Sequence, residues 1–403
     1  MNNIELIIRL SQVDSWFFRD ARPHDAAGAS RLSSQFPPPL ATLAGAVRTR
    51  LGDSLGVDWQ QFARGEALVS LGDEQIDLCT LIGQGDDTGN LTFGPPALLF
   101  NNAPLYPVPA YLLDAADQGM VRLVPGKGVC CDLSQRAPNG ELAEVRLPEF
   151  PAGIVNAKPL DYCWTDGDAM GQLLRGVSIR RDQVLDRAQL FVLEPRLGIA
   201  RNNQTRSVQD GLLYQTEHLR LLPEVELAFS LKLPAVAADA LRRSIQDNPI
   251  QRLGGEGRMA AMQIDDSLDL ALPQISPTNG AQGIVLTLLS AADVPGVGAE
   301  QPLPGFTSYI NPETYEQGWR GRLADIDLEL VTAVTGKIVR LGGWDLNQRA
   351  PKDVVSLLPA GSSWFMRPLG GVTLSDVITR LHGANLGQRT ELGYGRLACG
   401  LWQ

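Results

Sequence analysis

Two short glycine-rich stretches, placed near the ends of two long segments of this chain, nearly repeat each other. Residues 253–260 read LGGEGRMA, and residues 392–398 read LGYGRLA. Each stretch follows a segment with helical spacing and leads into a short apolar run that is typical of a strand. A glycine-rich turn used twice indicates one structural unit used twice, so the near-repeat predicts a chain built from two related halves.

In the first half, apolar residues three or four apart predict helices, and alternation of apolar and polar residues predicts strands. The elements in chain order are a strand at 4–13, a helix at 40–51, a loop and strand at 198–214, a strand at 224–231, a helix at 235–246 and a turn with a strand at 253–264. Residues of about 55–190 are irregular and rich in Gly and Pro. We predict a large insertion there that holds structure of its own, since structureless loops of that length are rare.

The second half repeats the order of the first. Its predicted elements are a strand at 283–291, a weak helix at 312–322, strands within 328–345 and 354–368, a helix at 374–381 and a closing turn and strand at 392–402. The order β-α-β-β-α-β is that of a ferredoxin-like unit. We therefore predict an α+β fold of two tandem ferredoxin-like domains, at 1–270 and 275–403, with the insertion in the first.

The net charge restricts the function. The chain carries 35 Lys and Arg against 45 Asp and Glu, a net charge of −10, whereas a stand-alone nucleic-acid binder is usually basic. Only five of the basic residues are Lys, and the remaining Arg side chains suit bidentate phosphate contacts, although a GC-rich genome would produce the same bias. We expect that any RNA is held in a local groove, inside a larger complex.

Targeting and metal-binding signals are weak. The first residues carry Glu5 where a signal peptide would carry Lys or Arg, and the longest apolar run, at 283–289, is too short to span a bilayer. We expect a soluble, cytoplasmic protein without membrane partners. Five Cys without CxxC spacing and three scattered His make a zinc site improbable, so we predict reduced thiols, no metal and no cofactor.

Both glycine-rich turns are candidate RNA contacts. Glycine lets backbone N–H groups approach a ligand closely, and the Arg that follows adds a fork-shaped charge suited to phosphate. The candidate residues are Gly254, Gly255, Arg258, Gly395 and Arg396. This chemistry favours phosphate-backbone recognition, and hence nucleic acid, over a small-molecule enzyme.

Two further segments have the composition of RNA contacts. Residues 198–206, GIARNNQTR, include Arg201, Asn202 and Arg206, which could bind phosphates, ribose hydroxyls and base edges, unless the loop is merely solvated. Residues 16–23, WFFRDARP, place Arg19 and Arg22 beside aromatic residues that could stack on bases. The alternative for these aromatic residues is a place in the core.

Signals for catalysis are few. The chain has no HExxH, Walker lysine loop or GxSxG pattern. His24 follows the first strand among Arg and Asp neighbours and could act as general base on a ribose 2′-OH in metal-independent RNA cleavage, but a loop His without a function is the better interpretation. Three hypotheses remain: an RNA-holding subunit, an endoribonuclease that uses His24, and a scaffold whose glycine-rich turns contact protein only.

Taken together and in order, these motifs resemble one family, the third RAMP subunit of the type III-B CRISPR effector, or Cmr complex. The segments that carry the resemblance are WFFRDARP at 16–23, PPPLATLAGAVR at 37–48, GIARNNQTR at 198–206, LGGEGR at 253–258, GGWD at 342–345, PAGS at 359–362 and GYGR at 393–396. They extend over nearly the whole chain, and residues of about 55–190 are covered least.

The resemblance implies two RRM-like RAMP domains and a non-catalytic role in antiviral defence against RNA targets. It implies that the chain grips the repeat-derived 5′ tag of the crRNA and docks against the large polymerase-like subunit and a RAMP backbone subunit. The residues that would contact RNA are Arg19, Arg22, Arg201, Asn202, Arg206, Gly254, Gly255, Arg258, Gly395 and Arg396. Asn202 and the second glycine-rich turn could instead face protein.

Overall fold

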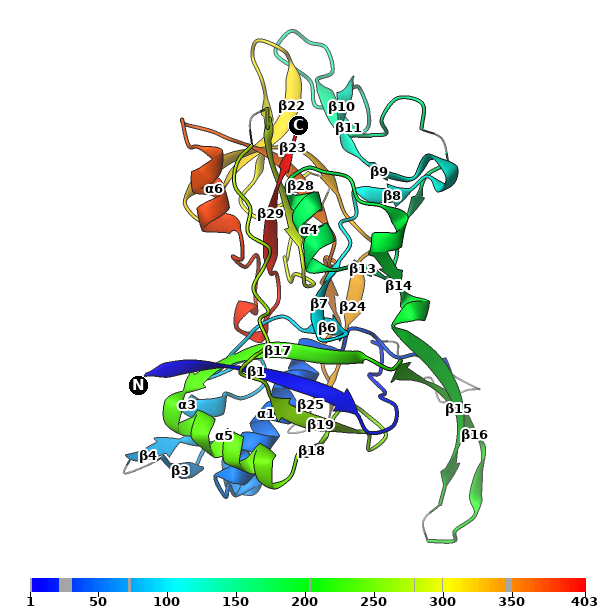
Figure 1. Ribbon diagram of the computed structural model, residues 1–403, viewed down its shortest axis with the longest axis vertical. Helices are drawn as coiled ribbons and strands as arrows, with labels where there is room; N and C mark the ends of the chain where they lie inside the picture. Colours follow the sequence, from blue (N-terminus) through cyan, green and yellow to red (C-terminus); the bar gives the residue numbers. More distant parts are fainter. Residues whose placement is uncertain are drawn as a thin grey trace.

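Two large sheets form the two lobes of the molecule, and a long β-hairpin projects from the lower lobe (Figure 1). The computed structural model describes residues 2–21, 31–71, 74–154, 156–202, 204–278, 280–298, 300–345 and 350–403. The predicted mixture of helices and strands is confirmed. Among the described residues, no helix is both long and apolar enough to cross a membrane.

The first lobe is built on four antiparallel central strands. They follow the spatial order β6 (Ala97–Phe100), β17 (Val225–Pro234), β1 (Asn3–Gln12) and β19 (Met259–Ile264). At the edges the sheet is extended by β7 (Ala103–Pro107), β13 (Cys163–Thr165), β14 (Val184–Asp186) and β18 (Ile250–Arg252), and β5 (Thr92–Phe93) also pairs with β17.

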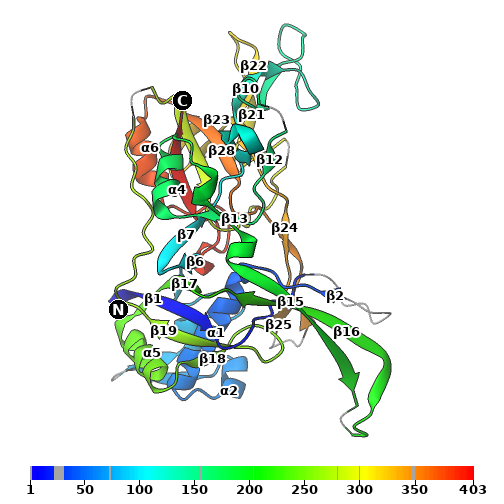
Figure 2. The same ribbon diagram turned by 45° about the vertical axis from the view of Figure 1, so that its right-hand side comes forward.

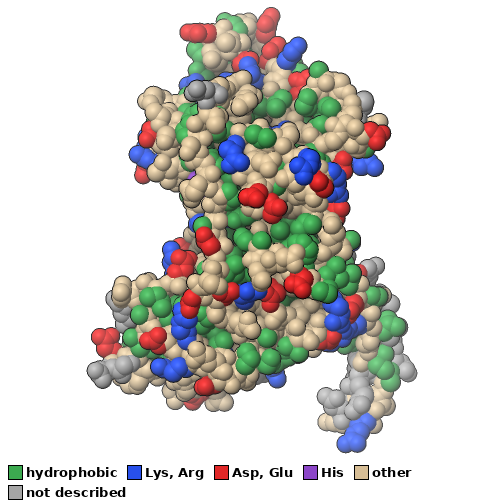
Figure 3. Space-filling view, viewed as in Figure 1, with side chains coloured by type: hydrophobic (Ala, Val, Ile, Leu, Met, Phe, Trp, Pro, Cys, Tyr) green, Lys and Arg blue, Asp and Glu red, His purple; other side chains and the backbone are tan. Residues whose placement is uncertain are grey.

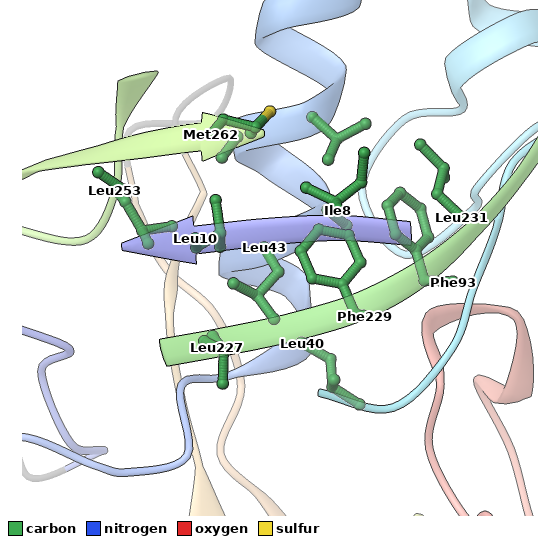
Figure 4. Packing of buried hydrophobic residues seen from close by; sticks show 14 of the residues in the cluster. Ile8, Leu10, Leu40, Leu43, Phe93, Leu227, Phe229, Leu231, Leu253 and Met262 are labelled. Atoms are coloured by element: carbon green, nitrogen blue, oxygen red, sulfur yellow. The ribbon is translucent and has the colours of Figure 1, made fainter. Parts of the chain in front are cut away.

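Helices α1 (Leu40–Ser54) and α5 (Ala235–Asp247) cover one face of this sheet. Alternation along β1 sends Leu6, Ile8 and Leu10 into the core, and α1 meets them with Leu40 and Leu43 (Figure 4). Each helix begins directly after a proline, Pro39 before α1 and Pro234 before α5, and Pro234 is also the last residue of β17. The other face of the sheet, with Glu5, Ile7, Ser230 and Lys232, is turned toward the second lobe.

The second lobe has its own sheet, whose strands β20 (Gly283–Leu288) and β29 (Leu397–Trp402) are buried on both faces. Its order is β10 (Val124–Val129), β11 (Glu144–Glu149), β22 (Glu316–Leu323), β23 (Ile326–Val334), β28 (Ser363–Pro368), β20 and β29, with β21 (Thr307–Ile310) on β22. Ile284 and Leu286 of β20 share a core with α6 (Leu374–Leu381), whereas Val285 faces a second core that includes Leu173 of α4 (Gly167–Leu174).

The segment 55–190 supplies parts of both lobes. Besides β5–β7, β13 and β14 in the first sheet, it contributes β10 and β11 to the second sheet and places α4 against β29. It also forms a small sheet of β12 (Lys158–Pro159), β8 (Leu112–Asp114) and β9 (Met120–Arg122), and a module of α2 (Trp59–Ala63), β3 (Leu68–Leu71), β4 (Glu74–Asp77) and α3 (Leu78–Ile82) beside α1. The segment therefore joins the lobes instead of forming a separate unit.

The second half of the chain also completes the first core. Between β23 and β28, the chain leaves the upper lobe through β24 (Val339–Leu341) and returns through β27 (Val355–Leu357), with the short pair β25 (Trp344–Asp345) and β26 (Ala350–Pro351) at the far end (Figure 2). Among the described residues, four second-half side chains are buried in the first-lobe core: Leu341, Leu357, Leu392 and Tyr394. The lobes thus share one core at their junction.

Five predicted elements are confirmed: the strands at 4–13 and 224–231 and the helices at 40–51, 235–246 and 374–381. Three agree to within one residue at each end, whereas β17 and α1 continue three residues beyond the predicted ends. The helix predicted at 312–322 is wrong, because this segment forms β22, paired with β21 and β23. Gly318 and Gly321 weaken a helix there. A Cβ at Gly321 would lie 2.5 Å from the Phe306 ring, so the strand is also held close against its neighbour.

Candidate nucleic-acid interface

The predicted polar loop 198–206 lies at the end of the projecting hairpin. This hairpin, here named the arm, consists of β15 (Phe191–Arg201) and β16 (Val208–Leu221), which pair from Phe191–Leu221 outward (Figures 1 and 2). Near the body, β16 also pairs in parallel with β2 (Arg31–Leu32). The arm therefore carries the candidate RNA contacts of this loop away from the two lobes.

Asn202 holds the turn at the tip of the arm. Its side-chain oxygen accepts hydrogen bonds from the backbone N–H groups of Gln204 at 2.9 Å and Thr205 at 3.3 Å, and its own N–H donates to Ser207 O at 2.9 Å. This is an Asx turn, in which a short side chain replaces a backbone acceptor. The carboxamide oxygen of Asn202 is thus engaged within the chain.

Arg206 remains at the surface of the tip, with a left-handed backbone at φ 56°. Residues 198–208 contain this Arg and Arg201 but no Asp or Glu. Apolar side chains also project from the arm, and Leu197 is 75% exposed with Ile199 and Val208 exposed near it. The outer arm therefore combines positive charge with apolar surface, a combination that suits single-stranded nucleic acid.

Where the arm meets the body, one carboxylate gathers three Arg side chains. Asp14, just after β1, accepts from Arg220 at 2.8 Å, Arg258 at 2.9 Å and Arg196 at 3.2 Å. Arg220 also pairs with Glu194 of β15. The hydrogen bond from Arg220 is the main cause that lowers the pKa of Asp14 to about 2. We name these five residues the arm-base cluster.

The first glycine-rich turn packs against the segment that contains the predicted aromatic platform. Gly255 donates its N–H to Phe17 O at 2.8 Å, and a Cβ at Gly254 would lie 2.5 Å from the same oxygen. Gly254 has φ +82°, a conformation that favours glycine. The space that these glycines leave open is thus occupied by the backbone of Phe17 and not by a ligand. Arg258 pairs with Asp14.

The aromatic residues at 16–18 are core residues. Trp16, Phe17 and Phe18 are all buried, Trp16 donates its indole N–H to Met259 O at 3.1 Å, and Phe17 stacks on the buried His218. The alternative of a place in the core is confirmed, so these rings do not form an exposed base-stacking platform. Arg19, next along the chain, is exposed beside them.

The second glycine-rich turn lies at the junction of the lobes. A Cβ at Gly393 would come 2.7 Å from the backbone of Gly94, Gly395 donates its N–H to Ala291 O at 2.9 Å, and Tyr394 is buried in the first-lobe core. Arg396 is half-buried, and burial lowers its pKa. The two turns therefore have different surroundings, although their sequences nearly match.

A cleft of about 1880 Å³ lies between the lobes, and the molecule narrows at this level (Figure 3). The open face of the first sheet lines it with Glu5 and Lys232, and Arg396 lines it from the second glycine-rich turn. Its charges are mixed in sign, because Asp20, Asp161, Asp269, Lys337 and Arg340 also contribute.

The predicted site residues that the structure describes thus occupy three places. Gly254, Gly255 and Arg258 lie together at the arm base, and the exposed Arg19 follows the aromatic residues on which this turn packs. Asn202 and Arg206 lie at the arm tip with the backbone of Arg201, and Gly395 and Arg396 lie at the lobe junction. Arg22 and His24 lie outside the described residues. Sequence reasoning missed Asp14, Arg196 and Arg220. The signal that could have revealed the two Arg is their position on either side of the polar loop, which a hairpin brings together.

One family matches almost the entire chain. The family described as CRISPR-associated protein (Cas_Cmr3) matches residues 8–402. The chain belongs to this family. Membership in Cas_Cmr3 confirms the resemblance to the third RAMP subunit of the type III-B effector that the motifs indicated.

Three solved structures that resemble this Cas_Cmr3 chain have low sequence identity to it. A search of curated proteins finds no match. A chain of a type III-B Cmr-beta complex bound to cognate target RNA is 16% identical, with a TM-score of 0.44 over 90% of this chain and 86% of that chain. A RAMP protein that binds different RNA substrates is 7% identical (TM-score 0.29; 100% and 99% covered), and a chain of a Csm1–Csm4 cassette with AMPPNP is 12% identical (TM-score 0.30; 89% and 98% covered).

Proposed function

We propose that this Cas_Cmr3 protein is a non-catalytic subunit of the type III-B CRISPR effector that binds the 5′ tag of the crRNA. In this proposal it docks the large polymerase-like subunit and a RAMP backbone subunit, and it serves antiviral defence against RNA targets. Membership in the family supports the assignment to a CRISPR complex. The observation that carries the RNA-binding part is the arm, whose tip is positively charged and projects from the body.

The proposal includes two ferredoxin-like RAMP domains, at 1–270 and 275–403, with 55–190 inserted in the chain of the first and supplying β10, β11 and α4 to the second lobe. The strand order supports it. In the first lobe the central order is β6-β17-β1-β19, and in the second it is β23-β28-β20-β29, with antiparallel neighbours in both. In each lobe the first and third strands of a split unit would be central. In the second unit β21 and β22 follow the first strand in place of a first helix, and α4 covers the face of the sheet opposite α6.

The negative charge of the chain is concentrated away from the arm. Residues 53–90 hold eight Asp and Glu against a single Arg, so this segment accounts for most of the net charge of −10. Its β3, β4 and α3 lie at the lower left of Figure 1, whereas the arm lies at the lower right. Because the local distribution of charge governs the approach of a polyanion more than the sum does, an acidic chain can present an RNA-binding arm.

A salt titration tests the RNA contact at the arm tip. Arg206→Ala should weaken binding of a crRNA with an intact 5′ tag to the full-length chain assembled with its large partner. For single-stranded RNA, the loss of one phosphate contact should reduce the log–log slope of affinity against salt by about 0.7. Arg64→Ala is the matched control, since it removes the same charge from the acidic segment, where Arg64 pairs with Glu66.

The expected result is a shallower slope for Arg206→Ala and an unchanged slope for Arg64→Ala. Zero-length UV crosslinking of the same assembly should then yield crosslinked peptides from residues 198–206. If the slope of Arg206→Ala equals that of the unmodified protein and the crosslinks lie only on other subunits, the chain is a scaffold that contacts protein only.

A further inference from the structure

The arm-base cluster joins three parts of the chain that are distant in sequence. Arg196 belongs to β15, Arg220 to β16 and Arg258 to the first glycine-rich turn, and the carboxylate of Asp14 contacts all three. Asp14 itself follows β1, the central strand of the first sheet. A single side chain on the rigid body of the lobe therefore meets both strands of the arm and the turn beside it.

The contacts of Arg220 restrict the direction of the arm. Its guanidinium donates to the Asp14 side chain at 2.8 Å, to the Asp14 backbone oxygen at 3.1 Å and to Glu194 of the paired strand. A planar guanidinium held along two edges has little freedom to rotate. The backbone pair between Trp16 and Leu219, at 2.8 Å in both directions, adjoins this contact, so the root of β16 is fixed against the segment after β1.

The cluster is reachable from solvent. The side chain of Asp14 is 48% exposed, and those of Arg196, Arg220 and Arg258 are 33%, 38% and 23% exposed. A single ion pair at such exposure contributes little to stability, whereas a network of several charges contributes more, and the three pairs on Asp14 also have an effect besides stability. Their shared effect is geometric, because they set how the arm and the turn lie relative to each other.

We propose that Asp14 is a positioning residue for RNA binding: it holds the arm and the first glycine-rich turn in one fixed relation, so that a single RNA strand meets both. The proposal rests on the proposed function. It gives Arg258 a structural partner inside the chain, and it assigns to an acidic residue a positive effect on the binding of a polyanion.

Electrostatics and positioning predict opposite results for Asp14→Asn. The cluster holds three Arg and two carboxylates, so the substitution raises its net charge from +1 to +2, which by itself would strengthen RNA binding. Loss of positioning frees long side chains that must be ordered again on binding, and this should weaken the affinity roughly tenfold. A weaker affinity of Asp14→Asn can therefore not come from the charge change.

The experiment compares three variants of the full-length chain, assembled with its large partner, in binding to crRNA with an intact 5′ tag. Asp14→Asn should bind roughly tenfold more weakly. Asp14→Glu keeps the carboxylate and should recover most of the affinity. Glu256→Gln removes one exposed negative charge from the same turn without touching the cluster, and it should bind equally or up to about fivefold more tightly.

Hydrogen–deuterium exchange provides the readout that a general loss of stability would not give. In Asp14→Asn, exchange should rise in β15 and β16 and stay unchanged in β1 and β17. Binding of Asp14→Asn that equals or exceeds that of the unmodified protein, or unchanged exchange in the arm, would overturn the proposal. Failure of the proposed function is a separate result, because then the unmodified assembly would show no arm-dependent binding and Arg206→Ala would have no effect.

Discussion

Gly254 offers a test of why the first glycine-rich turn contains glycine. Gly254 and Gly257 both have positive φ, at +82° and +62°, but their surroundings differ. A Cβ at Gly254 would lie 2.5 Å from Phe17 O and 3.1 Å from the Phe18 ring, whereas a Cβ at Gly257 would meet no atom within 4 Å. Substitution of each by Ala therefore separates the cost of backbone conformation from the cost of close packing.

The expected magnitudes follow from these two costs. An L-residue in the left-handed region costs roughly 1–2 kcal/mol, and this applies to both positions. Forcing a methyl group into a filled space costs about 1–3 kcal/mol more, and this applies to Gly254→Ala alone. The lower entropy of the unfolded chain favours both variants by a similar amount and cancels in the comparison. Gly254→Ala should thus lose about 1–3 kcal/mol more stability than Gly257→Ala.

Urea denaturation followed by circular dichroism measures the stability of the two variants, and RNA binding is measured on the same samples. A lower midpoint for Gly254→Ala at an unchanged slope would establish that the glycine is required by packing against Phe17. Equal midpoints for the two variants, together with loss of RNA binding only in Gly254→Ala, would refute this reasoning. That result would mean that an RNA backbone, and not the chain itself, requires the glycine.

Two further predictions concern the lobe junction and the root of the arm. A fragment of residues 1–270 should show no cooperative melting by circular dichroism unless 275–403 is supplied, since four core side chains come from the second half and each contributes about 1.5–3 kcal/mol. His218, 1% exposed, has a pKa lowered to about 4 by burial and by Arg258 and Arg196. Below about pH 6.5, His218 is protonated in the unfolded state but stays neutral in the folded state. The free energy of unfolding should therefore fall by about 3 kcal/mol from pH 6.5 to 4. Urea midpoints measured across this pH range should show the fall, and it should be smaller in His218→Gln.

Elements whose periodicity is local could be predicted well from the sequence. The strand at 4–13 and the helices at 235–246 and 374–381 appear with nearly the predicted bounds, because each buries one regular face on a neighbouring element. Local periodicity did not assign the segment 312–322 correctly, since it predicted a helix where the structure has a strand. Its two glycines and the packing of Phe306 on Gly321 favour a strand, but that packing depends on residues outside the segment.

The arm shows a second limit of sequence reasoning. The polar composition of 198–206 identified an exposed loop, and the structure places it at the tip of a hairpin. The length of the pairing and the position of its root depend on contacts between residues far apart in the chain, such as Asp14 with Arg258. No local pattern of charge or hydrophobicity marks Asp14 as the partner of three Arg, which is why the arm-base cluster was missed.

The near-repeat of the glycine-rich turns is explained by their place in the fold. Each turn leads into the last strand of its lobe, and that strand pairs antiparallel with the first strand, as β19 does with β1 and β29 with β20. Yet Arg258 reaches an exposed carboxylate at the arm base, while Arg396 is half-buried beside the cleft. Since the same topological position accounts for the shared glycines in both lobes, the repeat is evidence for a repeated architecture. Contact with RNA has to be established for each turn separately, from what surrounds its Arg.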